Sequence, residues 1–222
     1  MLKQFRESYL VIFGYFVLLF VLWSIWELIL SSITLIAFGI VCHEFIGAVL
    51  KISLWTIPSI CLLSKYKSKL FIKLKEMFTM KITWVKYWLF FLGFAVYNIG
   101  GAYLTMGKIT IHRDFNMVSL IGTVLFVGIT EEMVFRGFLL NTTLPKMKKW
   151  TAITLNAIMF LVIHFPIWIY KGIFFDTLLS GGFLLVAALS VVFSVTFIKS
   201  KNILVPIALH MFWNLLVCLF FG

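Results

Sequence analysis

Long apolar stretches alternate with short polar, mostly basic ones along the whole chain, and this alternation sets the expected fold. Each apolar stretch is close to the roughly 20 residues that a helix needs to cross the hydrocarbon core of a bilayer. We therefore expect an all-α polytopic membrane protein, a bundle of about seven transmembrane helices that forms a single transmembrane domain over residues 1–222. The predicted spans are 9–30, 46–64, 84–105, 118–140, 151–169, 177–198 and 203–221.

The segment 31–45 leaves the number of spans open. Ser31 and Ser32 could end the first helix, or that helix could continue to Val41 and tilt. An eighth, partly inserted segment is the alternative. The first apolar run is longer than the h-region of a signal peptide and lacks a small-residue cleavage site, so we expect it to remain as a transmembrane helix.

The composition supports a membrane protein and changes how the charge is interpreted. Hydrophobic residues make up 63% of the chain and charged residues only 12%, whereas soluble domains carry roughly 25% charged residues. The net charge of +11 would suit nucleic acid, but most lysines and arginines lie between apolar runs, so they indicate topology and not a nucleic-acid partner. The cysteines, Cys42, Cys61 and Cys218, are too scattered for a disulfide framework or a metal cluster.

The basic residues alternate between rich and poor connections, which predicts the orientation. The segments rich in basic residues are the N-terminus and the connections after the second, fourth and sixth spans. They and their margins hold Lys3, Arg6, Lys65, Lys67, Lys69, Lys73, Lys75, Lys81, Lys86, Lys146, Lys148, Lys149, Lys199 and Lys201. The other connections hold Lys108, Arg113 and Lys171, and Lys51 lies near the start of the second span. The positive-inside rule thus places the N-terminus in the cytoplasm and the C-terminus outside. Membrane lipids are expected partners, with the segment 65–83 lying on anionic headgroups.

Three charged side chains interrupt the fourth span. Charges at bilayer depth are costly and usually serve a function, paired or facing a polar cavity. Glu132 and Arg136 are four residues apart on one helix face, so they can form an ion pair. Glu131 is rotated away by about 100° and has no local cation. It is therefore the carboxylate expected to remain available for chemistry.

Two further spans carry polar groups that could join this carboxylate. The fifth holds His164, and the seventh holds His210 and Asn214 on one face. Either histidine alone could merely hydrogen-bond a neighbouring helix, but the set together predicts a shared functional cavity. A carboxylate and a neutral imidazole can activate water, and a second histidine and an amide can stabilise the oxyanion formed at a carbonyl. The expected chemistry is peptide hydrolysis without a cofactor, although two histidines and a glutamate also suit zinc.

These residues form three motifs of a known family. The stretches Glu131-Glu132-Met-Val-Phe-Arg136, Phe160-Leu-Val-Ile-His164 and His210-Met-Phe-Trp-Asn214 fit EExxxR, FxxxH and HxxxN. The chain, through its motif-bearing part 118–221, resembles the CPBP family of intramembrane endopeptidases, which is also called the CAAX protease and bacteriocin-processing, or Abi, family.

The resemblance implies a glutamate-type intramembrane protease whose helical bundle encloses a cavity open towards the cytoplasm. It implies that Glu131 and His164 activate water and that His210 and Asn214 stabilise the oxyanion. It also implies that Glu132 and Arg136 shape the site.

The resemblance also bears on substrates. The eukaryotic branch of the family cleaves prenylated CAAX proteins, and bacterial members are linked to bacteriocin maturation, self-immunity and peptide-pheromone processing. The small size and the preference for lysine over arginine favour a bacterial cell-membrane protein, so we expect a peptide substrate in preference to a lipidated protein. Two other functions stay open: a non-catalytic scaffold or bacteriocin-immunity protein that binds a partner, and a proton-coupled transporter, because intramembrane Glu and His also form proton relays.

Overall fold

The computed structural model describes residues 2–113 and 115–221, and these residues form helices joined by short connections, with no strand among them. The elements are α1 (Leu2–Ile25), η1 (Trp26–Leu30), α2 (Ser31–Leu50), η2 (Lys51–Thr56), α3 (Ile57–Lys65), η3 (Lys67–Lys69), α4 (Glu76–Thr79), η4 (Trp84–Tyr87), α5 (Trp88–Met106), α6 (Met117–Ser119), η5 (Leu120–Phe126), α7 (Val127–Glu132), η6 (Met133–Leu140), α8 (Asn141–Thr143), α9 (Lys149–Val162), α10 (Phe165–Tyr170), α11 (Phe174–Leu179), α12 (Gly182–Ser200) and α13 (Leu204–Phe220).

Several of the described helices are long and apolar enough to cross a membrane. Four stretches qualify, Leu10–Lys65, Trp84–Met106, Lys149–Tyr170 and Gly182–Ser200, and Leu204–Phe220 is a shorter apolar helix. The predicted span 118–140 is not among the four, although α6 to α8 form a continuous helical rod through it. The all-α membrane-type fold is thus confirmed, whereas the number of seven spans stays a prediction.

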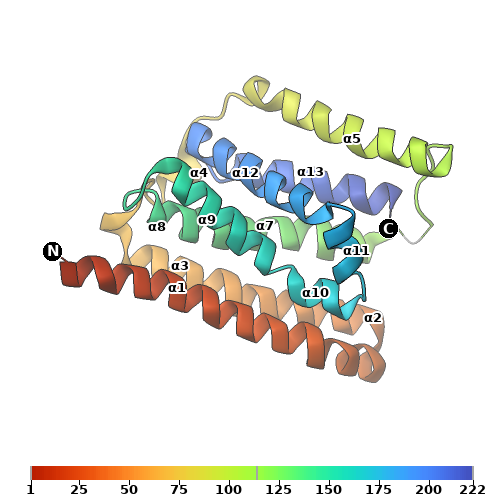
Figure 1. Cartoon of the computed structure of the whole chain (residues 1–222), viewed down its shortest axis with the longest axis horizontal. Helices are drawn as coiled ribbons and strands as arrows, with labels where there is room; N and C mark the ends of the chain where they lie inside the picture. The colour runs from red at the N-terminus through yellow and green to blue at the C-terminus, as the bar shows by residue number, and fades with distance from the viewer. Residues whose placement is uncertain (1, 114, 222) are drawn as a thin grey trace.

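The ambiguous segment 31–45 forms the turn of a helical hairpin. The first helix continues through η1 into α2 and reaches Gly39, whose φ of 74° and ψ of 173° lie outside the helical region. Beyond this residue the chain returns through η2 and α3 beside α1 (Figure 1). The residues between the first two predicted spans therefore complete the two helices of this hairpin.

The remaining helices stack on this hairpin in layers (Figure 1). In the middle, α9 packs against α12 and α7 packs against α13, while α5 packs on the far side of α13. The main apolar core joins the hairpin to η6 and α9, through side chains such as Trp55, Phe135 and Phe160. Large apolar side chains such as Ile36 and Leu104 are exposed on the outside, as expected of a surface that faces lipid.

The two ends of the bundle differ in character. The N-terminus and the connection that contains α4 lie at one end, and the Gly39 turn, α10 and the C-terminus lie at the other (Figure 1). The lysine-rich connection is tied to the bundle, because Asn141 Nδ2 donates to Ile72 O (2.8 Å) and Ile72 N–H donates to Asn141 Oδ1 (2.7 Å). Ile72 and Met77 are buried. This connection therefore closes its end of the bundle with apolar side chains.

We expect Gly39→Ala to lower the free energy of unfolding by about 1–3 kcal/mol, because this backbone conformation strains any residue with a Cβ. No atom lies within 4 Å of the added Cβ, so the effect is conformational and not steric. Thermal unfolding of the detergent-purified protein measures it.

The matched control is Gly93→Ala in α5, where the added Cβ also meets nothing within 4 Å but the backbone is helical. This change should be neutral or slightly stabilising, because alanine is the better helix former. Equal unfolding temperatures for the two variants would contradict the strain argument.

Candidate active site

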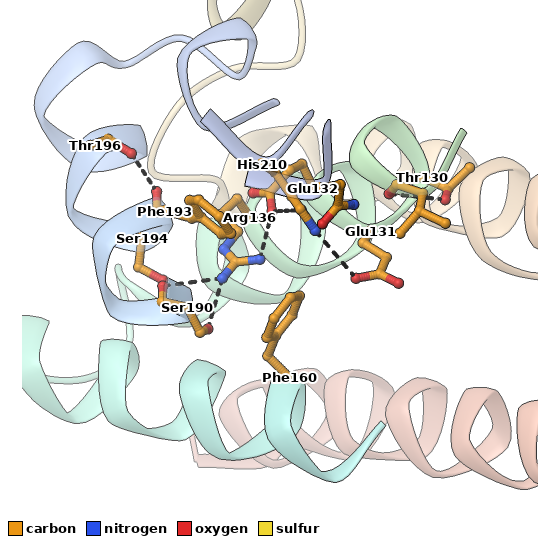
Figure 2. Close-up of polar contacts among 12 residues, drawn as sticks. Thr130, Glu131, Glu132, Arg136, Phe160, Ser190, Phe193, Ser194, Thr196 and His210 are labelled. Atoms are coloured by element: carbon orange, nitrogen blue, oxygen red, sulfur yellow. Dashed lines mark hydrogen bonds and ion pairs between the residues drawn. The ribbon is translucent and has the colours of Figure 1, made fainter. Parts of the chain in front are cut away.

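The two adjacent carboxylates of α7 have different surroundings. Both are buried, and in Figure 2 the side chain of Glu132 points towards Arg136 whereas that of Glu131 points away from it. Arg136 Nη1 donates to Glu132 Oε1 at 2.9 Å. The ion pair that the i, i+4 spacing predicts is thus confirmed.

Arg136 has no exposed surface, and the surrounding helices supply its partners. Its Nη2 donates to Ser190 Oγ (2.7 Å) and to Ser190 O (3.1 Å) on α12. The guanidinium also lies over the rings of Phe160 (4.5 Å to the centroid) and Phe193 (5.2 Å). A buried charge is costly unless it is paired and hydrogen-bonded. These contacts supply partners for Nη1 and Nη2, whereas the buried Nε of Arg136 has no hydrogen-bond partner among the described residues.

His210 of α13 lies between the two carboxylates (Figure 2). Its Nδ1 is 2.8 Å from Glu132 Oε1, and because a carboxylate can only accept, Nδ1 carries the hydrogen. The ring stacks on Phe193, with centroids 4.9 Å apart and planes at 19°. Its Nε2 is 4.0 Å from Glu131 Oε2, too far for a direct hydrogen bond and suited to a bridging water.

The absence of a side chain at Gly128 lets α13 approach α7 closely enough for this contact. A Cβ on Gly128 would lie 2.5 Å from Cγ of Met211, the residue after His210. The glycine therefore contributes to the site by the space that it leaves.

His164 lies at a break in the fifth predicted span, because α9 ends at Val162 and α10 begins at Phe165. Its Nδ1 is 2.6 Å from Phe160 O, one helical turn earlier. A carbonyl can only accept, so Nδ1 carries the hydrogen, and Nε2 of the neutral ring has a free lone pair. This tautomer leaves Nε2 able to accept a proton or a hydrogen bond.

All four predicted catalytic side chains, Glu131, His164, His210 and Asn214, line one cavity of about 460 Å³. Asn214 Nδ2 donates to Thr123 O at 3.1 Å, which orients the amide at the cavity wall. Glu132 and Arg136 are not part of the cavity lining, and they lie behind it as supports of His210.

Lys51 is a site residue that the sequence analysis missed. Its Nζ lies 3.3 Å from Glu131 Oε1 and 4.7 Å and 5.2 Å from the ring centroids of Trp23 and Trp55. Glu131 thus has a cation after all, supplied by η2 instead of by its own helix. The available signal was a lysine inside a predicted span, where charges are uncommon.

Other polar residues of the first hairpin line the same cavity, namely Glu27, His43 and Glu44. His43 stacks on Trp26 at 5.5 Å between centroids, and its Nδ1 is 2.9 Å from Thr34 Oγ1. Within residues 2–113 and 115–221, no group of three or more His, Cys, Asp and Glu side chains is placed to hold a metal ion. Zinc dependence itself stays untested.

The cavity lies towards the Gly39 end of the bundle. Its lining includes Leu35 and Ile40, on either side of the turn, and Lys171 just beyond α10. The N-terminus lies at the other end (Figure 1). The cytoplasmic N-terminus that the basic residues predict would thus put the cavity at the end opposite to the cytoplasmic opening that the family resemblance implies.

We expect Arg136→Met to lower the free energy of unfolding by about 3–5 kcal/mol, because it leaves the Glu132 carboxylate buried without its cation. Chemical unfolding of the purified protein measures this. Lys73→Met is the control, since it breaks an exposed pair, Lys73 Nζ to Glu76 Oε1 at 3.5 Å, and should cost less than about 1 kcal/mol. Similar losses of unfolding free energy in both variants would show that the buried pair stabilises the fold no more than the exposed pair does.

The comparisons with known proteins agree with this geometry. A family model described as Rce1-like, "Type II CAAX prenyl endopeptidase Rce1-like", matches residues 113–216. Neither a curated protein nor a solved structure matches the chain. The matched segment contains all three motifs and therefore Glu131, His164, His210 and Asn214. Lys51, which contacts Glu131, lies outside it. The resemblance drawn from the motifs is thus confirmed for this segment, which is similar to the Rce1-like CAAX prenyl endopeptidase family.

Proposed function

We propose that the protein is an intramembrane endopeptidase of the glutamate type, which hydrolyses a peptide bond of a membrane-associated peptide. One observation carries this proposal: a carboxylate, two imidazoles and an amide from three separate parts of the chain line one cavity. The match to a protease family over residues 113–216 supports the reaction class. A bacteriocin or pheromone precursor is the favoured kind of substrate.

Glu131 is the proposed general base. Its Oε1 is held by Lys51, while its buried Oε2 has no hydrogen-bond partner in the protein. A water molecule bound to Oε2 would satisfy this oxygen, because buried polar atoms in native proteins are nearly always paired. Glu131 then takes a proton from this water as it attacks the peptide carbonyl and returns it to the leaving nitrogen when the C–N bond breaks. Nε2 of His164 accepts the second hydrogen bond of the same water.

His210 and Asn214 are the proposed oxyanion donors. Because Nδ1 of His210 already donates to Glu132, Nε2 can donate only when the ring is an imidazolium. The buried Glu132 carboxylate stabilises that positive charge, and Arg136 holds Glu132 in place. Preorganised donors of this kind are often the largest single contribution to catalysis of acyl transfer.

Lys51 is the proposed positioning residue for the base. It holds one oxygen of Glu131 and so turns the other towards the water site. The two tryptophan rings confine the ammonium group by cation–π contacts, so that the lysine side chain stays at the cavity wall beside Glu131.

We expect Glu131→Gln and His164→Gln each to lower peptide cleavage by roughly 10²–10⁴-fold, because each change removes a group that handles the proton of the attacking water. The measurement is mass spectrometry of membrane-associated peptides from cells that produce the wild type or a variant, followed by rates on a peptide recovered in that comparison.

Glu44→Gln is the matched control, because Glu44 lines the same cavity but belongs to none of the motifs. It should retain cleavage. Normal cleavage by both motif variants would exclude the proteolytic mechanism, and a cell phenotype that Glu131→Gln preserves would favour a binding or immunity role. Loss of cleavage in a chelator, together with zinc on the purified protein, would replace the glutamate mechanism with a zinc mechanism.

For Lys51→Met we expect kcat to fall by about 10–100-fold with little change in KM, because the base loses its orientation and the substrate loses no contact. Lys51→Arg should recover most of the rate, since a guanidinium can also pair with a carboxylate and stack on aromatic rings. Steady-state kinetics with the same peptide measure both variants. An unchanged kcat in Lys51→Met would show that the pair is not used in catalysis.

A further inference from the structure

We propose that Glu27 is a specificity residue of the cavity, which binds a cationic side chain of the substrate, a lysine or an arginine close to the cleaved bond. The proposal rests on the proposed function for the cleavage step, whereas binding of a cation at Glu27 can be tested without cleavage. Three features of the molecule lead to it: the burial of Glu27, the lack of a partner for its carboxylate, and its position beside the proposed general base.

Glu27 is a buried acid in a helix that is long and apolar enough to cross a membrane. It lies in η1, within the stretch Leu10–Lys65, and only 6% of its surface is exposed. Because Glu27 follows Trp23 by four residues, both side chains lie on one helix face, and both line the cavity. Ionisable side chains at membrane depth are costly and usually serve a function, so we expect a role for this carboxylate.

The carboxylate of Glu27 has no hydrogen bond and no direct ion pair with any described residue. The charges of Lys51 and Lys171 act on it only from farther away. Lys51 is bound to Glu131 at 3.3 Å, and Lys171 is exposed just beyond the end of α10. A direct partner for Glu27 must therefore come from what enters the cavity.

The charges of the cavity lining favour a cation as that partner. Apart from its histidines, the described lining holds three acids, Glu27, Glu44 and Glu131, and two lysines, Lys51 and Lys171. Lys51 and Glu131 compensate each other, and the more exposed Glu44 and Lys171 carry opposite charges. Glu27 is thus the acid that the lining leaves uncompensated, and opposite charges attract more strongly at a buried site than in water.

Glu27 also lies close to the site of the proposed reaction. A recess of about 80 Å³ beside the main cavity is lined by Glu27 together with Lys51, Glu131 and His164. The segment η1, which carries Glu27, packs against α10, the helix that begins just after His164 (Figure 1). A substrate side chain that Glu27 holds therefore belongs to a residue near the cleaved peptide bond.

The cavity suits the rest of such a side chain as well as its charge. Trp26 and Tyr170 supply aromatic surface to the lining, on which the aliphatic part of a lysine or an arginine can lie. Lys51 already shows how this cavity holds a cation, since its ammonium group pairs with Glu131 and lies 4.7 Å from the ring centroid of Trp23. Because Glu131 compensates Lys51, a substrate cation at Glu27 meets no uncompensated positive charge there.

Kinetics with a peptide recovered in the mass-spectrometric comparison test the proposal, after its lysines and arginines are replaced one at a time by the neutral norleucine. For Glu27→Gln we expect KM to rise by about 10–100-fold with little change in kcat, because a charge-assisted contact of the bound substrate is lost. One norleucine replacement should raise the KM of the wild type by a similar factor and that of Glu27→Gln very little. Equal KM values of wild type and Glu27→Gln for every peptide would overturn the proposal.

Glu44→Gln is the matched control, because Glu44 lines the same cavity but is half-buried and outside the recess. It should keep the KM and the preference of the wild type. Glu27→Gln should unfold at the same temperature as the wild type or a higher one, since it removes an unpaired buried acid. A clear fall in its unfolding temperature would assign Glu27 to the fold and overturn the proposal.

Reversal of both charges adds a test that a structural role would not pass. Glu27→Lys should cleave the original peptide poorly, and it should recover cleavage when the lysine or arginine that the norleucine series identifies is changed to glutamate. Poor cleavage of both peptides by a Glu27→Lys protein that elutes normally on size exclusion would count against the proposal.

A binding measurement separates this proposal from the proposed function. Nα-acetyl-lysine amide, a small probe without a peptide substrate's cleavage site, should raise the unfolding temperature of the wild type and leave that of Glu27→Gln unchanged. Nα-acetyl-norleucine amide should change neither. This result together with unchanged cleavage in Glu131→Gln would keep the cation site and exclude the proteolytic function. Loss of cleavage in Glu131→Gln, with equal shifts in wild type and Glu27→Gln, would refute the cation site alone.

Discussion

The site depends on three buried groups in contact: the Arg136 guanidinium, the Glu132 carboxylate and the His210 imidazole. This contact places a guanidinium and a carboxylate that have no exposed surface beside a buried imidazole that borders the cavity. Charged groups are costly in a low-dielectric interior unless they are paired, so η6, α7, α9, α12 and α13 must all pack correctly to supply the partners. Folding of the bundle and assembly of the site are therefore one process.

This arrangement also explains how two neighbouring glutamates come to differ. Glu132 Oε1 accepts hydrogen bonds from Arg136 and from His210, and the second of these bonds orients the histidine ring. Glu131 is held at one oxygen by Lys51 and keeps the other oxygen towards the cavity. Adjacent positions on a helix face directions about 100° apart, so a single pair of acids provides both a structural anchor and a reactive group.

The sequence was informative where a relation is local along the chain and where short motifs mark the residues concerned. The spans follow from hydropathy, the Glu132–Arg136 pair from helical spacing, and the meeting of His164, His210 and Asn214 with Glu131 from motifs in separate apolar segments. The contact of Lys51 with Glu131 could not be predicted in this way, because it joins residues 80 positions apart. The end at which the cavity opens depends on how α10 and the hairpin pack, which no periodicity encodes.

The first hairpin lies outside the matched segment 113–216 but forms one wall of the cavity, through Trp23, Trp26 and Lys51. Helices satisfy their own backbone groups within a bilayer, so cavity-facing side chains of this hairpin can change without loss of its backbone hydrogen bonds. The proposed site takes its motif residues from the matched segment and its base-positioning Lys51 from the hairpin. Exchange of cavity-facing hairpin residues other than Lys51 and the tryptophans that hold it is thus a way to retarget such a protein while its motif residues stay in place.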